Sequence, residues 1–270
     1  MLWLLQESAR QIAGGDWPDR QMLQQALTRA GVCTATDKPL RLAPDEPGAS
    51  DPYEIRLYQH GELGFRAHNW HDLFNVLIWL TFPRAKAALN AKHYAAYAHE
   101  RPAAGGRGAV RDALTLFDED GVIVLATDPG LLQLIRDFQW KPLFWERRAE
   151  VVDCMCFLPF GHALCEKALN PFRGMTGRGL LFAVDSAFLE LEPTQQLAAI
   201  DILLARQIME DGVLQRTRDL APVPVLGVPG WCPGNERAEY YDDSQYFRPG
   251  RGYRQRPLQP APATQGKGST

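Results

Sequence analysis

Apolar residues recur at intervals of three to four positions in several parts of the chain, a period that predicts helices with one buried face. The two stretches 2–13 and 18–30 show this period, and so do 129–138, 161–169 and 194–210. The most apolar stretch, 73–82, is apolar on all sides, which indicates a buried helix.

Two signals around that apolar stretch predict a helical hairpin. Asn69 is a favourable N-cap, and Asp72 three residues later can bond back to the cap residue. Pro83 suits the first turn of a second helix that follows almost directly. We therefore expect two antiparallel helices joined by a minimal link.

Alternating or continuous apolar runs predict the strands. Residues 53–68 alternate around His60-Gly61 and predict one β-hairpin. The runs 113–117 and 122–126 flank an acidic turn and predict a second hairpin, and 150–160 and 179–186 are also typical of strands. Helices interleaved with short antiparallel hairpins predict an α+β fold rather than a repeated β-α-β arrangement.

The pattern also divides the chain. Residues 1–216 are predicted to form one α+β body, with 33–52 as an extended connection. Residues 217–250 are too rich in proline for a helix and too apolar for disorder, so we expect an extended segment packed on the body. Its predicted anchors are Val223, Val225, Leu226, Trp231 and Phe247. Residues 251–270 are predicted to be a disordered tail.

Composition narrows the class of protein. The 270 residues are 46% hydrophobic and carry a formal net charge of -3, which gives no global reason to expect nucleic acid or an anionic membrane as partner. We find no convincing signal peptide and no apolar run of about 20 residues, the length that spans a bilayer. Five irregularly spaced cysteines favour a reducing compartment, so we expect a cytoplasmic protein.

The basic tail is a separate question. Arginines at 248, 251, 254 and 256 and a lysine at 267 could add weak, salt-sensitive contact with RNA. A tail that only improves solubility is the simpler interpretation.

A polar stripe on the second helix of the hairpin is the main candidate site. Lys86, Asn90, His93 and Tyr97 follow one another at spacings of four, three and four, which places them on one helical face. If this face meets His71 and Asn75 of the first helix, two imidazoles, two amides and an ammonium group converge. The alternative is a hydrogen-bonded seam with a structural role.

Two other motifs invite comparison with phosphate-hydrolysing enzymes. The His71-Asp72 doublet differs from that of metal-dependent HD phosphohydrolases because it lies in the first turn of its helix. Asp118 and Asp120 lie in an aspartate-rich segment similar to that of haloacid-dehalogenase-type phosphatases, but an ordinary hairpin turn is the simpler explanation.

Near residue 160 the sequence offers zinc ligands. Cys154, Cys156, His162 and Cys165 are suitable residue types, but their spacing matches no common zinc motif. His162 can also reach Glu166 one turn later, which would orient it as a general base.

Four separate blocks resemble one protein family. The segments WHDLFNVLIWLTFPRAKAALNAKH, RDALTLFDEDGV, FGHALCEK and PVPVLGVPGWCPGNE with YYDDSQYFRP occur in the order typical of the domain-of-unknown-function family numbered 3025. The resemblance spans about residues 50 to 250 and implies an intracellular, single-domain protein from a mainly proteobacterial family. It implies no activity, cofactor or metal, and the cysteines around His162 are not part of its pattern.

The functional hypothesis from the sequence is a hydrolase acting on a small anionic substrate. Its cleft would lie between the helical hairpin and the segments 107–120 and 161–167. The expected catalytic residues, as bases, acids or metal ligands, are His71, His93, Asp112 and His162, and the expected substrate-binding residues are Asn75, Lys86, Asn90, Tyr97 and Arg111.

The alternative is a non-catalytic binding or assembly protein. In it the polar groups would satisfy one another, and exposed parts of Trp140, Phe144 and Trp145 would form a contact surface. The sequence assigns neither a cofactor nor a metal.

Overall fold

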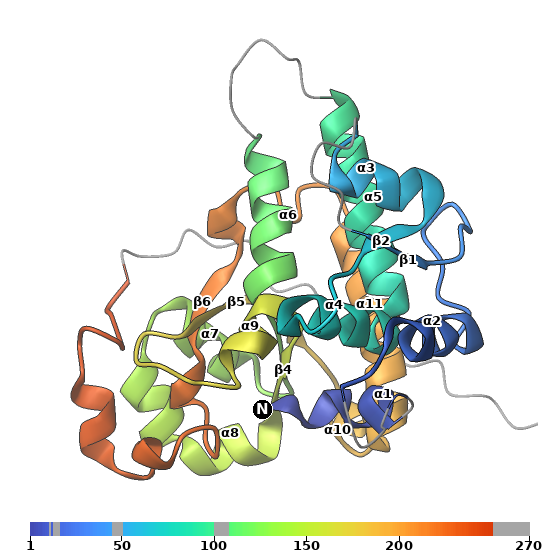
Figure 1. Cartoon of the computed structure of the whole chain (residues 1–270). Coiled ribbons are helices and arrows are strands. Elements are labelled where there is room, and N and C mark those ends of the chain that lie inside the picture. Colours follow the sequence, from blue (N-terminus) through green and yellow to red (C-terminus); the bar gives the residue numbers. More distant parts are fainter. Residues whose placement is uncertain (11, 13–16, 45–50, 100–107, 251–270) are drawn as a thin grey trace, which may run out of the picture.

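A mixed four-stranded sheet lies at the centre of the fold (Figure 1). The computed structural model describes residues 1–10, 12, 17–44, 51–99 and 108–250. The strand order is β4 (Met155–Pro159), β3 (Gly121–Ala126), β5 (Thr176–Ala183) and β6 (Ala221–Pro224). β3 runs antiparallel to β4 and parallel to β5, and β5 runs antiparallel to β6.

The sheet separates two hydrophobic cores. Ile123 and Leu125 of β3 point into the first core, whereas Val122 and Val124 point into the second. Because both faces of β3 are covered, every residue of this strand is buried, and its sequence is a continuous apolar run.

Helices cover both faces. The first core lies under η1 (Leu2–Leu5), α1 (Gln6–Arg10), α2 (Arg20–Arg29), α3 (Tyr53–His60), α4 (Trp70–Thr81), α5 (Pro83–His99), α6 (Ala109–Asp120), α10 (Ser186–Leu189) and α11 (Pro193–Met209). The second lies under α7 (Pro129–Arg136), a π-helical turn (Pro142–Glu146), α8 (Arg148–Cys154) and 3-10 turns at Val225–Gly227 and Ala238–Asp242. α9 (His162–Lys167) contributes to both cores, and 3-10 turns at Thr217–Asp219 and Pro233–Glu236 complete the element order. In Figure 1, α5 and α11 lie on the right and α7 and α8 at the lower left.

Helix α5 is fixed against α11 at two points. Near its start, the carboxylate of Asp201 accepts hydrogen bonds from the backbone N–H groups of Arg84 (3.1 Å) and Ala85 (2.8 Å). Further along, Lys92 donates to the carbonyl oxygen of Ile208, in the last turn of α11, and to that of Val213, beyond the end of this helix. These contacts hold α5 in place and with it the polar residues that it carries.

The first predicted hairpin is wrong. Residues 53–60 form helix α3, and only Glu62–Gly64 (β2) is a strand, paired in parallel with β1 (Arg41–Ala43). Gly61 ends α3 in the left-handed conformation, with φ of 70°. The sequence does not distinguish the two structures here, because Ile55 and Leu57, which are buried in helix α3, could equally be buried by a strand.

The second predicted hairpin is half wrong. Residues 113–117 belong to α6, which ends at Asp120, and β3 follows from Gly121 without a turn. Similarly, 150–154 are the end of α8, and only 155–159 form a strand. Short apolar runs do not distinguish a buried strand from the buried face of a helix.

The remaining major elements are confirmed. The helical hairpin is α4 and α5, with the side chain of Asn69 accepting a hydrogen bond from the N–H of Asp72. The helices expected near 129–138, 161–169 and 194–210 are α7, α9 and α11, and the strand expected at 179–186 lies within β5 and just beyond it. The fold class is α+β, although the central sheet is mixed rather than built from hairpins.

The C-terminal segment contributes to the sheet and to the second core. β6 pairs with β5, and Val223, Val225, Leu226 and Phe247 are buried there, while Trp231 is half-buried. The tail predicted over 251–270 lies outside the described residues. None of the described helices combines the length and the apolar character needed to cross a membrane.

The predicted aromatic contact surface is absent at two of its three positions. Trp140 and Phe144 are 4% and 0% exposed and pack in the second core. Only Trp145 remains partly accessible, so these residues do not form the exposed patch that a binding protein would use.

Candidate functional site

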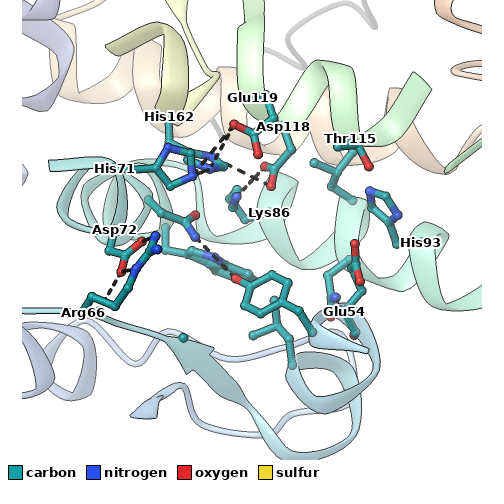
Figure 2. A pocket seen from close by; sticks show the side chains of 17 residues that line it. Glu54, Arg66, His71, Asp72, Lys86, His93, Thr115, Asp118, Glu119 and His162 are labelled. Carbon is teal, nitrogen blue, oxygen red and sulfur yellow. Dashed lines mark hydrogen bonds and ion pairs between the residues drawn. The ribbon is translucent and has the colours of Figure 1, made fainter. Parts of the chain in front are cut away.

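A polar pocket of about 310 Å³ lies between helices α3, α4, α5, α6 and α9 (Figure 2). Its described lining comprises Tyr53, Glu54, Leu57, Gly64, Arg66, His71, Asp72, Asn75, Trp79, Lys86, Leu89, Asn90, His93, Thr115, Asp118, Glu119 and His162.

Helical periodicity brings most of these side chains together. Residues three or four apart share one face of a helix, so each helix presents a short row to the pocket. The rows are His71, Asn75 and Trp79 on α4, Lys86, Asn90 and His93 on α5, and Thr115, Asp118 and Glu119 on α6.

Two histidines and two glutamates meet at one end of the pocket. The Nε2 atoms of His71 and His162 are 2.9 Å apart, and His71 Nδ1 lies 3.2 Å from a carboxylate oxygen of Glu166. Glu119 Oε2 lies 3.6 Å from His162 Nε2 and 3.9 Å from His71 Nε2. Figure 2 shows His71, His162 and Glu119 directed toward one another from three different helices. We call these three residues the histidine cluster.

A close backbone contact places His162 in the cluster. The N–H groups of Phe160 and Gly161 both donate to the carbonyl oxygen of Gly121, at 2.8 and 2.9 Å. A Cβ atom on Gly161 would lie only 2.3 Å from the carbonyl oxygen of Glu119, so this approach requires glycine. The turn before α9 is thus pressed against the end of α6, and His162 begins α9 beside Asp118 and Glu119.

A buried ion pair lies directly behind the cluster. Lys86 Nζ is 2.5 Å from Asp118 Oδ1, and the lysine side chain is only 4% exposed. Burial alone would raise the pKa of Asp118, but the ammonium group of Lys86 outweighs it and holds this pKa below its usual value. Asp118 is therefore charged and balances the charge of Lys86.

Burial sets the protonation of the cluster itself. It lowers the pKa of His162 to about 3, despite the opposing effect of Asp118, so this imidazole is neutral at physiological pH. Burial, followed by repulsion from Asp118, raises the pKa of Glu119. Asp118 Oδ2 lies 3.9 Å from His162 Nδ1, on the side of the ring away from His71.

The opposite wall carries amides and a second ion pair. Asn90 Nδ2 donates to the carbonyl oxygen of Glu54 at 3.0 Å, and Asn75 Nδ2 lies 3.4 Å from the hydroxyl of Tyr53. Asp72 accepts two bonds of 2.9 Å from the guanidinium of Arg66, and a further bond from the Arg66 backbone N–H. Asp72 therefore holds Arg66, and does not bond back to the cap residue as the sequence suggested.

The pocket unites six of the nine residues named from the sequence: His71, Asn75, Lys86, Asn90, His93 and His162. Tyr97 does not line it; this residue is 43% exposed, and the guanidinium carbon of Arg111 lies 5.2 Å from the centre of its ring. Asp112 lines a neighbouring depression that shares Thr115 and Glu119 with the pocket.

Sequence reasoning missed Glu119 and the true partner of Glu166. Interpreting 113–117 as a strand hid the helical spacing of Thr115, Asp118 and Glu119, the signal that would have placed these three on one face. Glu166 was assigned to His162, four residues earlier, but it contacts His71 of α4 instead. A contact between two helices that lie far apart in the sequence leaves no local sequence pattern from which it could be predicted.

The aspartate-rich segment does not have the phosphatase arrangement. Asp118 and Asp120 lie in the last turn of α6, rather than after a strand, and Asp120 is 2.6 Å from the ammonium of Lys167. Each aspartate therefore already has a cationic partner, Lys86 in the case of Asp118.

The structure offers a different metal-ligand set from the one suggested by the cysteines. Among the described residues, the ligand atoms of His71, Glu119 and His162 all lie within 4.8 Å of one another, and no cysteine belongs to this group. Burial raises the pKa of the Cys156 thiol to about 11 and that of Cys165 to about 12, which opposes the thiolate form that binds zinc.

Comparison with known sequences places the chain in a family. A family model described as a protein of unknown function (DUF3025) matches residues 42–251, well over half of the chain. All four blocks noted in the sequence lie inside this range. No curated protein and no solved structure matches the chain.

Proposed function

Because the chain belongs to the DUF3025 family, whose description gives no activity, we propose a function from the pocket alone: a hydrolase that activates water at the histidine cluster. The observation that carries the proposal is the orientation of His71. Its Nδ1 is held by Glu166, while its Nε2 is directed toward His162 and Glu119.

This orientation fixes which nitrogen carries the proton. A carboxylate beside Nδ1 favours the tautomer with hydrogen on Nδ1, which leaves the Nε2 lone pair directed into the pocket. Burial lowers the pKa of His162 to about 3, so this imidazole is neutral at physiological pH. The neutral His162 and the Nε2 atom of His71 are thus placed to hold the reacting water at this end of the pocket.

Glu119 is the group best suited to move the proton. Its pKa is raised by burial and by the neighbouring charge of Asp118, which brings it closer to neutrality, where a carboxylate is a more effective base. In the proposed reaction a water O–H bond breaks and the proton passes to Glu119. The oxygen bonds to a carbonyl carbon or phosphorus of the substrate, and the leaving group departs with the proton returned by Glu119.

The pocket suits a small substrate, since its volume of about 310 Å³ is at the lower end of the range for small-molecule sites. The anionic substrate that the sequence led us to expect would need a positive charge in the pocket that no carboxylate already neutralises. Both permanent cations of the described lining are already held by carboxylates, Arg66 by Asp72 and Lys86 by Asp118.

A binding protein without catalysis is the second candidate. It is favoured by the fact that several polar groups of the pocket satisfy one another, namely Lys86 with Asp118 and Asn90 with the backbone of Glu54. In that case the histidine cluster would hold a ligand and leave it unchanged.

A screen for hydrolysis separates the two. We expect the full chain, with divalent metal ions added, to hydrolyse at least one of p-nitrophenyl acetate, p-nitrophenyl phosphate, bis-p-nitrophenyl phosphate and a p-nitroanilide. The rate should fall by about 100-fold in Glu119→Gln and in His71→Ala, as is typical when an acid-base group or its support is removed.

His99→Ala and Glu239→Gln are the matched controls, because both residues are exposed and lie outside the pocket. They should retain the wild-type rate. Hydrolysis of none of the four substrates, or equal rates in Glu119→Gln and the controls, would count against a hydrolase at this site.

A further inference from the structure

We propose that His71, His162 and Glu119 bind one divalent transition-metal ion, with Zn²⁺ as the expected occupant. The inference deepens the proposed function by naming the cofactor of the same site. It rests first on distances. The three atoms His71 Nε2, His162 Nε2 and Glu119 Oε2 are separated by 2.9, 3.6 and 3.9 Å.

A triangle with these sides has the size of a three-ligand metal site. The point equidistant from its three corners is about 2.0 Å from each, the distance at which imidazole nitrogen and carboxylate oxygen bind Zn²⁺. Two histidines and one carboxylate are also the protein ligands of many catalytic zinc sites and of non-haem iron sites.

The outer nitrogens support the assignment. His71 Nδ1 lies within hydrogen-bond distance of Glu166, at 3.2 Å, whereas His162 Nδ1 lies 3.9 Å from Asp118 and makes no hydrogen bond to it. Metal-binding histidines usually direct their second nitrogen to a carboxylate, which turns the lone pair of the first toward the ion. In the tautomer with hydrogen on both Nδ1 atoms, the two Nε2 lone pairs would face each other at 2.9 Å, a repulsive arrangement that a cation between them would make attractive.

The charge of the pocket points the same way. In its described lining, two permanent cations face four carboxylates. The carboxylates are Glu54, Asp72, Asp118 and Glu119, and the cations are Arg66 and Lys86. A divalent ion balances this excess and supplies the positive charge that an anionic substrate requires.

The site is open on the side where a substrate would arrive. The side chains of His71 and Glu119 are 31% and 36% exposed, so a metal ion and water can reach them, whereas His162 is 4% exposed. Three protein ligands leave a fourth position for water, whose pKa falls to about 7 on zinc. One oxygen of Glu119 would bind the ion and the other would face the bound water; because the ion favours the charged carboxylate, the raised pKa of Glu119 applies to the metal-free protein.

Metal titration tests the site directly. Full-length protein freed of metal by a chelator is titrated with ZnCl₂, and separately with MnCl₂, by isothermal titration calorimetry. We expect one Zn²⁺ per chain. Loss of a ligand in His71→Ala, His162→Ala or Glu119→Gln should weaken binding by at least about 100-fold. Glu166→Gln, which changes only the support of His71, should weaken it by about 10 to 100-fold.

X-ray absorption of the zinc-loaded protein should show nitrogen and oxygen ligands and no sulfur. Cys156→Ser and His99→Ala are the controls and should bind as the wild type does, because neither residue belongs to the cluster. If His162→Ala fails to fold, the partly exposed Glu119→Gln still provides the test.

Each result has a distinct meaning. Absence of zinc binding, or binding that is lost in Cys156→Ser and kept in Glu119→Gln, would overturn the metal site. In that case the 2.9 Å contact is a hydrogen bond between the two histidines. Hydrolysis by metal-free protein that binds no zinc would keep the proposed function and overturn the metal site, whereas zinc bound at the cluster without hydrolysis would support the metal site and overturn the proposed function.

Discussion

The ammonium group of Lys86 shows how much the pocket depends on single side chains. Its side chain is 4% exposed, its nitrogen lies 2.5 Å from Asp118, and it also sits 5.6 Å from the centre of the Trp79 ring. Removing one member of a buried ion pair leaves the other without compensation, which costs more than the pair contributes as a whole.

We expect Lys86→Met to lower the free energy of unfolding by about 3 kcal/mol, since methionine fills the same space without the charge that Asp118 requires. Urea denaturation at neutral pH measures the change. Lys141→Met is the matched control, because Lys141 is 2.6 Å from Asp242 but both side chains are at least 35% exposed. An exposed pair of this kind contributes less than about 1 kcal/mol.

The double variant Lys86→Met with Asp118→Asn separates charge from packing. It should recover part of the lost stability, because no unpaired carboxylate remains. Equal losses of unfolding free energy in Lys86→Met and Lys141→Met would show that water in the pocket screens the charge of Asp118.

At this scale the sequence predicted much of the site. The spacing of Lys86, Asn90 and His93 was sufficient, because residues three or four apart on one helix share a face whatever the rest of the fold does. The ion pair with Asp118 was not predictable in the same way. Its two members lie on different helices, 32 positions apart, and only the packing of α5 against α6 brings them together.

At the scale of elements, the junction of α6 with α9 decides whether the histidine cluster forms. Gly161 lets the end of α6 and the start of α9 approach until backbone atoms are in contact. Glu119 and His162 are carried by these two helix ends, so their separation of 3.6 Å follows from the glycine contact.

Gly161→Ala is therefore expected to destabilise the protein by at least about 2 kcal/mol, the scale of overpacking in a tightly packed region. The new Cβ atom would lie 2.3 Å from the Glu119 carbonyl oxygen and 2.4 Å from the Gly121 nitrogen, and backbone cannot move aside as a side chain can. Thermal unfolding measures the effect.

Gly64→Ala serves as the control, since its Cβ would meet only the ring of Tyr53, at an ordinary contact distance of 3.6 Å. Its expected change is below about 1 kcal/mol. If both alanine variants melt at the wild-type temperature, the close approach of α6 and α9 is not needed for stability.

Elements with a long, regular pattern were the ones that the sequence predicted correctly. The hairpin of α4 and α5 was marked by an N-cap, a long apolar run and a proline, three signals that agree. The segment that became α6 gave only a five-residue apolar run beside an acidic turn, and this pattern fits a strand equally well. The error hid Glu119, and with it one third of the proposed metal site.

At the scale of the whole molecule, the sheet couples two cores that would otherwise be independent. β3 supplies Ile123 and Leu125 to one core and Val122 and Val124 to the other. β6 belongs to the same sheet and covers the second core with Val223. Loss of packing on one face of the sheet should therefore destabilise both cores.

This coupling predicts a single cooperative unfolding transition that includes the C-terminal segment. Val223→Ala in the second core and Leu125→Ala in the first should each lower the midpoint, with losses of about 2 and 3 kcal/mol for the cavities they create. Far-UV circular dichroism and tryptophan fluorescence should report coincident transitions in both variants, because Trp79 lies in the first core and Trp140 in the second. The opposite result is an early fluorescence change in Val223→Ala while the helical signal persists. It would mean that residues 217–250 detach on their own, and the sheet would then be a boundary between two units rather than their link.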